Sequence, residues 1–515
     1  MEKTVNQIKW GAIISYAQMA LNIVIGLIYT PIMLKLLGKS EYGLYNTVSS
    51  TISMLSILNL GFNSGYIRYY AKYKKENCET DIYKLNGLFL IIFTIIGIVG
   101  LFCGLFLSFN LELVFKEGLT ISEYKTAKIL MLLLTVNLAV SFPMGVFSNI
   151  ISAHEKYIFL KLLGILKTVI SPLVTLPLLL MGYRSVSMVL VTLIVSIVTD
   201  LLYLLYVKKA LRQRFIFKEF EKGIFKSLFA YTSFIAINLI VDQINWNIDK
   251  FLLGRFKGTG AVAVYSVGYM LYQYYMTLST SVSNVFTPRI HRIINQTAED
   301  ERQQTIQLTS LFVKVGRIQF LILSLIATGM IFFGKPFIYF WAGEGYEEAY
   351  YVMLLLVLSS SIALIQNCGI EIQRAENKHQ FRSILYSGMA IVNLVLSIFL
   401  CQKYGAVGSA IGTAISLILA NGIIMNIYYH KRCRLDIVVF WRNIVKMSFG
   451  LIPPVILGII LSNVMNLYTV YGLLAGIAIY CIIFCISVWL LSMNAYEKEM
   501  ITNLFKKLVK KHAKR

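Results

Sequence analysis

Apolar segments long enough to cross a bilayer recur along almost the whole chain. A helix that spans the hydrocarbon needs about 20 predominantly apolar residues, because its backbone polar groups must be satisfied within the helix. The connectors have at most about two dozen residues, so no domain outside the membrane is expected. The sequence therefore predicts an all-α polytopic membrane protein with about 14 transmembrane helices, at 10–34, 43–66, 86–109, 127–152, 158–181, 185–207, 228–254, 261–287, 311–334, 348–370, 382–402, 405–428, 447–466 and 468–493.

The distribution of charge predicts the orientation of these helices. The chain has 57% apolar residues, 14% charged residues and a net charge of +23, whereas soluble domains have roughly 25% charged residues. If the connectors alternate between the two sides with the N-terminus inside, about 37 of the 48 Lys and Arg residues lie inside, as expected for cytoplasmic connectors. We expect both termini in the cytoplasm, contact with anionic lipids of the inner leaflet, and no binding to nucleic acid.

The chain also resembles itself. The stretch "AHEKYIFLKLL" at 153–163 aligns without gaps with "AENKHQFRSIL" at 375–385, and each begins a pair of apolar segments. A repeat of six spans keeps its orientation, because six is even, so two parallel six-helix lobes related by an axis along the membrane normal are predicted. Chance similarity among leucine-rich segments is the alternative. The predicted division is an N-terminal six-helix lobe at 1–207, a basic cytoplasmic linker at 208–227, a C-terminal six-helix lobe at 228–430, an added helix pair at 447–493 and a basic amphipathic tail at 497–515.

The tail places apolar side chains on one helical face and lysines on the other. Ile501, Leu504, Phe505 and Leu508 form the apolar face. This pattern is typical of a helix that lies on an anionic membrane surface. A helix that binds a protein partner is the alternative.

The segment at 228–254 carries polar residues that hydrocarbon penalises. Asn238, Asp242, Asn245 and Asp249 form one helical stripe, and Lys250 lies beside it. A charge at the centre of a span costs ~2.5–3.5 kcal/mol, so this stripe is expected to border water or polar partners and to mark a translocation path. A structural hydrogen-bond cluster is the alternative interpretation, and Asp249 and Lys250 also lie near enough to the outer interface to snorkel.

Other predicted spans carry further polar groups. Tyr269 and Tyr272 share a helical face that suits sugar stacking, or equally ordinary packing. Lys161 and Lys167 lie near the cytoplasmic end of their span, where snorkelling also explains them. The remaining groups are Gln18 and Asn22 in the first span, Asn63 and Arg68 in the second, and Arg374 at the end of the tenth.

Motifs for covalent chemistry and for metal binding are missing. The seven cysteines are scattered, the five histidines lack metal-ligand spacing, and "LGKSEYG" at 37–43 lacks the first glycine of a phosphate-binding loop. We therefore predict a protein that is not an enzyme, has no cofactor and no metal site, and moves a molecule.

Three stretches resemble the polysaccharide flippase family of the multidrug/oligosaccharidyl-lipid/polysaccharide exporter superfamily. They are "LLGKSEYGLYNTV…LNLGFNSGYIRYYAKY" at 36–73, "DKFLLGRFKGTGAVAVYSVGYMLY" at 249–272 and "AENKHQFRSILYSGMAIVNLVLSIFLCQKYGAVGSAIGTAIS" at 375–416. The resemblance implies a bacterial cell-membrane protein with two lobes around a central cavity. It would move an undecaprenyl-pyrophosphate-linked oligosaccharide outward by alternating access. Its partners would be this lipid-linked oligosaccharide and the polymerase and glycosyltransferases of the same pathway.

The resemblance also suggests roles for the polar residues. Cations suit the pyrophosphate, and the candidates for it are Arg68, Lys250, Arg374 and Lys161. Candidates for the glycan path are Gln18, Asn22, Asn63, Asn238, Asp242, Asn245, Asp249, Tyr269 and Tyr272. The pair at 447–493 is similar to the added helices of peptidoglycan-precursor flippases, but the charged pair in the first span of those flippases is absent here.

Three other classes of membrane protein are alternatives to this interpretation. An ion-coupled multidrug or small-metabolite exporter of the same superfamily would have the same architecture. A membrane glycosyltransferase or polymerase needs a larger outside loop than residues 110–126 provide. A major-facilitator transporter needs an acidic-Arg connector after the second span, where "RYYAKYKKENCETD" stands instead.

Overall fold

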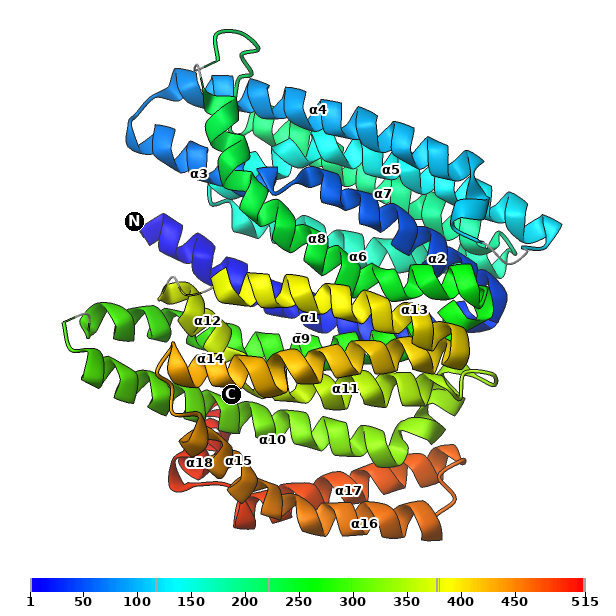
Figure 1. Ribbon diagram of the computed structural model, residues 1–515, viewed down its shortest axis with the longest axis vertical. Coiled ribbons are helices and arrows are strands. Elements are labelled where there is room, and N and C mark those ends of the chain that lie inside the picture. Colours follow the sequence, from blue (N-terminus) through cyan, green and yellow to red (C-terminus); the bar gives the residue numbers. More distant parts are fainter. Residues whose placement is uncertain are drawn as a thin grey trace. The chain divides into compact units, whose positions relative to one another are not determined.

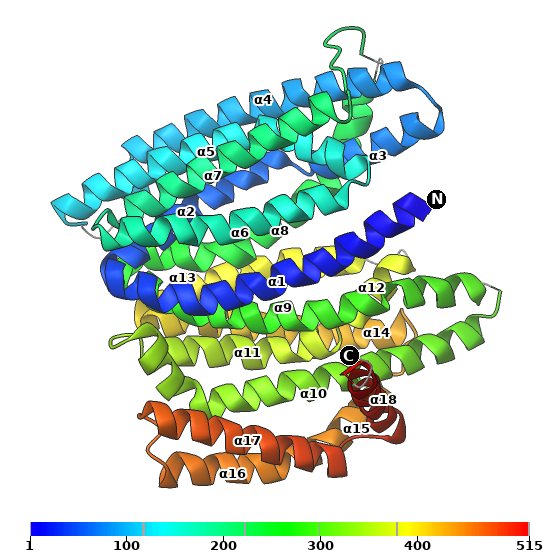
Figure 2. The same ribbon diagram turned by 180° about the vertical axis from the view of Figure 1, so that it is seen from behind.

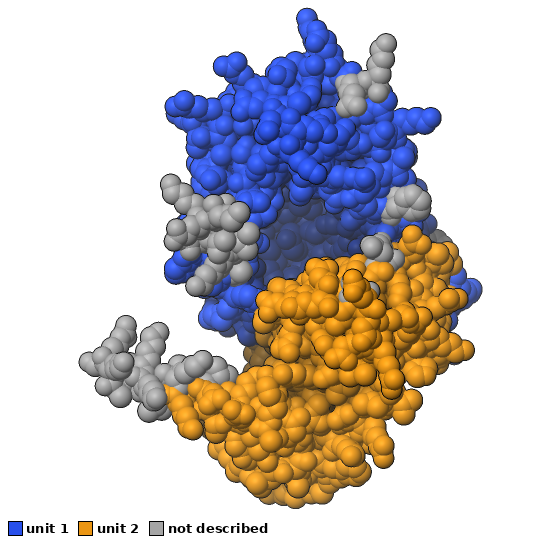
Figure 3. All heavy atoms as spheres, turned by 90° about the vertical axis from the view of Figure 1, so that its left-hand side faces the viewer, with its two compact units in different colours: residues 1–266, 393–409 blue, residues 267–392, 410–515 orange. Residues whose placement is uncertain are grey.

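The fold consists of helices that form two compact units. The computed structural model describes residues 2–115, 119–220, 223–297, 299–376, 378 and 380–512, without the side chains of 2–9, 12, 234, 504, 505 and 507–512. Within these residues every regular element is helical. The first unit comprises Met1–Ser266 and Asn393–Ser409, and the second comprises Val267–Val392 and Ala410–Arg515 (Figure 3). The apolar face of the tail predicted around Leu504, Phe505 and Leu508 lies outside the described side chains.

Long helices lie side by side in the first unit (Figures 1 and 2). Helix α5 packs between α4 and α7, and α1 packs on α6. Aromatic side chains fill much of the core: the Tyr66 ring meets the Phe89 ring edge-on at 5.2 Å between centroids. The helices are α1 (Glu2–Leu37), α2 (Lys39–Met54), α3 (Phe62–Lys75), α4 (Glu79–Phe109), α5 (Ile121–Ala153), α6 (Tyr157–Leu180), α7 (Arg184–Lys209), α8 (Ile224–Phe256) and the beginning of α9 (Thr259–Gln296).

The second predicted span, 43–66, is broken in the middle. Helix α2 ends at Met54, a 3-10 turn covers Leu55–Asn59, and α3 begins at Phe62. Leu60 and Gly61 have positive φ angles of 47° and 77°, a conformation that glycine adopts without a steric penalty. A Cβ on Gly61 would also lie 2.6 Å from a methyl carbon of Ile235 in α8. The break therefore depends on a residue without a side chain, and it lets α3 approach α8.

The buried side-chain amide of Asn86, in α4, holds the connector that follows α7. The Tyr66 hydroxyl donates to Asn86 Oδ1 at 2.7 Å, and Asn86 Nδ2 donates to the Arg214 carbonyl at 3.2 Å and to Gln213 Oε1 at 3.3 Å. Asn86 has no exposed surface, so these bonds satisfy a polar group that would be costly to bury alone. They fix the connector after α7 within the first unit.

The second unit contains the remainder of α9 and the helices that follow it. Helices α16 and α17 pack on α10 around Phe333, Leu461, Tyr480 and Phe484. Residues 418–424 form a π-helical turn, and Asn426 Nδ2 donates to the carbonyls of Asn421 and Gly422 there. The helices are α10 (Glu301–Ala342), α11 (Ala349–Ile365), α12 (Cys368–Ala375), α13 (Gln380–Leu417), α14 (Met425–Lys431), α15 (Ile437–Ser448), α16 (Ile452–Val464), α17 (Val470–Leu491) and α18 (Ala495–His512).

A buried ion pair holds the start of α18. Arg317 of α10 donates from Nε and Nη2 to the two carboxylate oxygens of Glu497, at 2.6 and 2.8 Å, and from Nη2 to the Ser492 carbonyl at 3.0 Å. The side chains of Arg317 and Glu497 are only 9% and 2% exposed. The base of the tail helix is therefore fixed to the helix bundle of the second unit by a bidentate contact.

The two similar stretches found in the sequence form the same backbone turn. Helix α5 ends at Ala153 and α12 ends at Ala375, the first residues of the aligned stretches. The amide of Lys156 donates to the Ile151 carbonyl at 3.1 Å, and the amide of Lys378 donates to the Gln373 carbonyl at 2.8 Å. The two donors are aligned residues, and each acceptor lies two residues before the start of its stretch, so the local similarity extends from sequence to hydrogen bonding.

Ten helices in the described residues are long and apolar enough to cross a membrane, and a bent pair raises this number to eleven. The bent pair is α11 with α12, which meet at 46°. One of the ten, Gln380–Lys431, has 52 residues. It contains Gly405 in a non-helical conformation, with φ of 59° and ψ of −135°. These findings confirm a polytopic, all-helical membrane protein within the part of the chain that the structure describes.

Candidate functional site

The polar residues of α8 lie in two different environments. Asn238 and Asp242 are exposed, Asn245 and Lys250 are half-buried, and Asp249 is only 2% exposed. The stripe predicted on this helix therefore divides into an accessible part around Asp242 and a buried part at Asp249.

The buried part contains a hydrogen bond between two helices. The hydroxyl of Tyr265, near the start of α9, donates to Asp249 Oδ2 at 2.8 Å. On the neighbouring stripe of α8, Asn247 Nδ2 donates to Gln243 Oε1 at 2.6 Å. The Asp249 carboxylate is thus buried and bonded to Tyr265. It does not extend to the outer interface, which was the alternative expected from its position in the sequence.

Helix α3 places a cation on the accessible face of α8. The guanidinium carbon of Arg68 lies 4.2 Å from the centre of the Tyr231 ring. Tyr231 precedes Asn238 by seven residues, so it lies two turns, or ~10 Å, along the same face. Stacking on an aromatic ring leaves the in-plane N–H groups of Arg directed to its surroundings. Arg68 therefore begins a polar face that continues through Asn238 to Asp242.

Helix α3 also contacts an amide of α5. Asn149 of α5 donates from Nδ2 to Oδ1 of Asn63 at 2.7 Å. Asn63 and Arg68 are both exposed residues of α3. The polar face of the first unit is the name used for two neighbouring sets: Arg68, Tyr231, Asn238 and Asp242, where α3 meets α8, and the pair Asn63 and Asn149, where α3 meets α5. Asn149 and Tyr231 were not predicted from the sequence, although the seven-residue spacing from Asn238 could have indicated Tyr231.

The candidates on α1 and α6 form a second group in the first unit. Gln18 packs on Gly164 so closely that a Cβ there would lie 2.6 Å from Gln18 Nε2. Lys161 is half-buried and lies three residues before Gly164 on the same face of α6. Asn22 is exposed, one turn after Gln18. These residues lie where α1 packs on α6.

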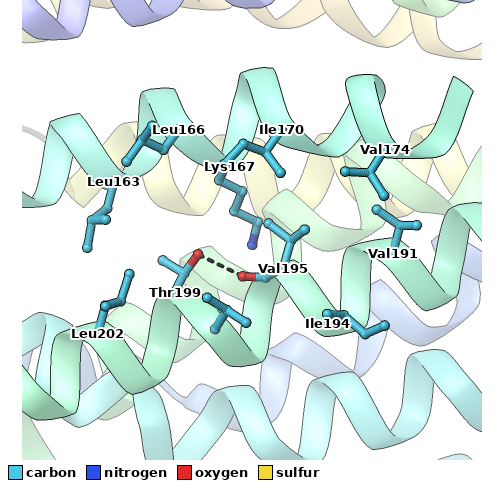
Figure 4. Close-up of a pocket in the computed structure, with 11 residues that line it drawn as sticks. Leu163, Leu166, Lys167, Ile170, Val174, Val191, Ile194, Val195, Thr199 and Leu202 are labelled. Carbon is cyan, nitrogen blue, oxygen red and sulfur yellow. Dashed lines mark hydrogen bonds between the residues drawn. The ribbon is translucent and has the colours of Figure 1, made fainter.

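A cavity of about 310 Å³ lies between α6 and α7. Figure 4 shows Lys167 extending from α6 toward α7 among aliphatic side chains. Its ammonium donates to Ser196 Oγ at 2.8 Å. The Lys167 ammonium thus has a hydrogen-bond partner on the adjacent helix, in addition to the route to the inner leaflet that the sequence suggested.

The remaining candidates belong to the second unit. Arg374 is exposed and donates from Nη1 to Glu371 Oε1 at 2.6 Å. Gln273 Nε2 donates to the Tyr269 hydroxyl at 2.6 Å, and the Tyr269 and Tyr272 rings are 5.8 Å apart. Tyr272 is only 7% exposed, so in this structure its ring serves mainly in helix packing.

The polar face can bind a ligand without reacting with it. It offers a guanidinium, amides and a carboxylate, which suit phosphates and hydroxyls. Among the residues that the structure describes, no group of three or more His, Cys, Asp or Glu side chains is placed to hold a metal ion.

Comparisons with known proteins agree in sequence and in fold. The family described as "Polysaccharide biosynthesis protein" matches residues 9–294. A Shigella flexneri protein named as an O-antigen transporter is 21% identical over 414 residues, which are 77% of this chain and 91% of that protein.

Two solved structures share the fold over most of the chain. The lipid II flippase MurJ, in an inward closed conformation, has a TM-score of 0.67 at 17% identity and covers 93% of this chain and 98% of its own. An inward-facing multidrug MATE transporter has a TM-score of 0.62 at 12% identity and covers 84% of this chain and 99% of its own. The matched family, the transporter relative and the spans place the chain in the bacterial cell membrane. We conclude that this multi-pass protein belongs to the polysaccharide biosynthesis protein family, whose model matches more than half of the chain.

Proposed function

We propose that the protein translocates an undecaprenyl-pyrophosphate-linked oligosaccharide across the bacterial cell membrane by alternating access, for the synthesis of a surface polysaccharide. The observation that carries this proposal is the polar face on α8, where exposed Asn238 and Asp242 continue from the stacked Arg68 within an otherwise apolar helix. A desolvated carboxylate is too costly to persist there without a polar surrounding. Family membership supports a precursor of a polysaccharide as the substrate.

The chemistry of the polar face fits the parts of this substrate. The guanidinium of Arg68 suits a diphosphate, because its donors match phosphate oxygens in pairs. Asn63, Asn238 and Asp242 suit sugar hydroxyls, which both donate and accept hydrogen bonds. A polyprenyl chain is apolar and would stay in the lipid, so the protein needs to bind only the polar headgroup. Lys250, Lys161 and Arg374 remain further candidates for the diphosphate.

A topology of fourteen crossings accounts for the helices. The eleven candidate spans become twelve if Gln380–Lys431 crosses twice, since 52 residues are more than twice the ~20 that one crossing needs. Gly405 supplies the break between the two crossings. Helix α9 and the broken pair of α2 and α3 would complete the fourteen. An even number puts both termini on one side, and the excess of Lys and Arg in alternate connectors places that side in the cytoplasm.

The two-lobe division remains part of the proposal. The matching turns after α5 and α12 support an internal repeat, because the same backbone hydrogen bonds recur at aligned positions. The six-helix lobes would cover 1–207 and 228–430, and α15 to α17 would form the added pair.

Surface polysaccharide in cells tests this function. Asp242→Ala and Lys250→Ala, made separately in a strain that lacks the chromosomal copy, should abolish surface glycan at unchanged membrane levels of the protein. Glu112→Ala and Lys226→Ala remove exposed charges of the same sign away from the polar face and should leave the glycan at the wild-type amount.

The result also distinguishes the alternative function. Wild-type surface glycan in both Asp242→Ala and Lys250→Ala would reject the site. If the strain without the protein kept its glycan and lost the ability to extrude small organic cations, the protein would be a multidrug exporter.

A further inference from the structure

We propose that α9 and α10 form a pocket for the phosphate headgroup of an anionic phospholipid, separate from the polar face of the first unit. A cavity of about 790 Å³ lies between residues 285–296 of α9 and residues 306–314 of α10. Both segments belong to the second unit. The antiparallel helices meet there near their connector, where Gln304 Nε2 donates to the Ile294 carbonyl at 3.4 Å.

The lining of this pocket is basic. Arg289 and Arg292 come from α9 and Lys314 comes from α10, and none of the lining residues is acidic. Gln296, Gln307 and Ser310 add hydrogen-bonding groups. Arg and Lys together with neutral donors are the groups that bind a phosphate and its hydroxylated substituents.

The carboxylates of the α9–α10 connector, Glu299, Asp300 and Glu301, do not line the pocket. Asp300 caps α10 by accepting from the amide of Gln303 at 2.9 Å. Glu301 forms an ion pair with Arg434. Within the pocket lining the three cations therefore have no acidic neighbour, so an external anion would meet a positive surface.

The pocket lies at the depth of lipid headgroups. Helix α10 has 42 residues and is therefore ~63 Å long, about twice the ~30 Å of the hydrocarbon. Residues 318–334 carry no charge, so this part of α10 is expected to cross the hydrocarbon. Arg317 lies at one end of this uncharged run, and Lys314 lies one turn farther from the hydrocarbon. In the proposed topology this end faces the cytoplasm.

Apolar side chains at the rim favour a lipid over a soluble anion. Val285 and Ile306 line the pocket and are 61% and 56% exposed, and Pro288 lies beside Arg289. A lipid would cover these side chains with its glycerol and acyl groups while its phosphate meets the cations. A free phosphate would leave them in water. Lys314 also stacks on Tyr496 of α18, at 3.4 Å from the ring centre, so the pocket adjoins the base of the tail helix.

Lipid binding by the full-length protein in detergent tests the pocket. Short-chain phosphatidylglycerol is titrated and bound lipid is counted by native mass spectrometry. The site variant carries Arg289→Gln, Arg292→Gln and Lys314→Gln. The matched control carries Lys209→Gln, Arg442→Gln and Lys446→Gln, which removes three exposed basic charges outside the pocket. We expect at least tenfold weaker phosphatidylglycerol binding in the site variant and less than a twofold change in the control, with equal melting temperatures before lipid is added.

Three results would overturn the proposal. The first is equal binding by the site variant and the control. The second is equally tight binding of glycerol 3-phosphate by the wild-type protein, which would assign the pocket to a soluble anion. The third is displacement of phosphatidylglycerol by far lower concentrations of undecaprenyl diphosphate, which would assign it to the transported lipid. Transport need not be measured, so the outcome is independent of the proposed substrate.

Discussion

At the scale of single residues, the stacking of Arg68 on Tyr231 determines where a cation meets the polar face of α8. An arginine on a short helix is free to take many rotamers, and an aromatic neighbour reduces that freedom before a ligand arrives. The ring centre is 4.2 Å from the guanidinium carbon, a distance at which the ring attracts the cation. The tyrosine is therefore a positioning residue for Arg68.

Replacing Tyr231 tests this role. Tyr231→Leu should weaken the apparent affinity for the lipid-linked oligosaccharide about two- to fivefold, because an exposed cation–π contact contributes ~0.5–1 kcal/mol. Tyr231→Phe keeps the ring and should bind like the wild type. The measurement is a substrate titration in vesicles. Equal affinities for Leu and Phe would show that the ring does not position Arg68.

A second residue-scale prediction concerns Gly43 in α2. A Cβ at this position would collide with the backbone carbonyl of Thr259, and a backbone atom moves less easily than a side chain. Gly43→Ala should therefore lower the free energy of unfolding by ~1–3 kcal/mol. Gly145→Ala in α5 meets no atom within 4 Å and should be neutral or stabilising, since Ala favours a helix. Thermal unfolding in detergent compares the two, and equal stability would contradict the close approach.

The sequence shows which polar residues fall within the predicted spans. It does not show which side chains those residues contact. Asn238 and Asp242 were predicted to share a helical face, because residues four positions apart lie on the same side of any α-helix. The contact of Asn149 with Asn63 joins residues 86 positions apart, and tertiary packing alone decides it. The same holds for Asp249, whose burial under Tyr265 depends on how α9 begins.

At the scale of elements, the ion pair between α10 and α18 stands out. Arg317 and Glu497 are 180 residues apart, and no local pattern connects them. The sequence predicted an amphipathic tail from its charges, whereas the bidentate contact that holds its base required the structure. The break at Leu60 and Gly61 is similar, because the apolar run of 43–66 continues through it and hides the change of direction.

Removing one partner of this ion pair should be costly. Glu497→Gln would leave Arg317 buried without a counter-charge, which destabilises by ~3–5 kcal/mol. We expect lower thermal stability and faster proteolysis or hydrogen exchange at 495–512. Arg434→Gln breaks the exposed pair with Glu301, whose side chains are 55% and 68% exposed, and should cost ~0–1 kcal/mol. Similar losses in both variants would contradict the role of burial.

At the scale of the whole molecule, the account requires fourteen crossings with both termini inside. Hydropathy identified the membrane spans because lipid imposes a length and an apolar composition on each helix. It also predicted separate spans at 382–402 and 405–428, because Gln402 and Lys403 interrupt the apolar run. The structure has a non-helical residue, Gly405, at this interruption.

Cysteine accessibility tests the crossings. In a background without other cysteines, Lys257→Cys and Lys403→Cys should react with an impermeant maleimide in intact spheroplasts. Cys78 and Arg432→Cys should react only after permeabilisation. Lys403→Cys on the same side as Arg432→Cys would reject the double crossing of 380–431.

The most direct test of the central claim is translocation in reconstituted vesicles. The purified protein is placed in liposomes that hold an undecaprenyl-pyrophosphate-linked oligosaccharide, and an impermeant glycosidase reports the fraction of glycan on the outer face. We predict that nearly all of the glycan becomes accessible with the wild-type protein, whereas about half stays protected with Asp242→Ala, as in protein-free vesicles. Equal protection with the wild-type protein and in protein-free vesicles would contradict the account.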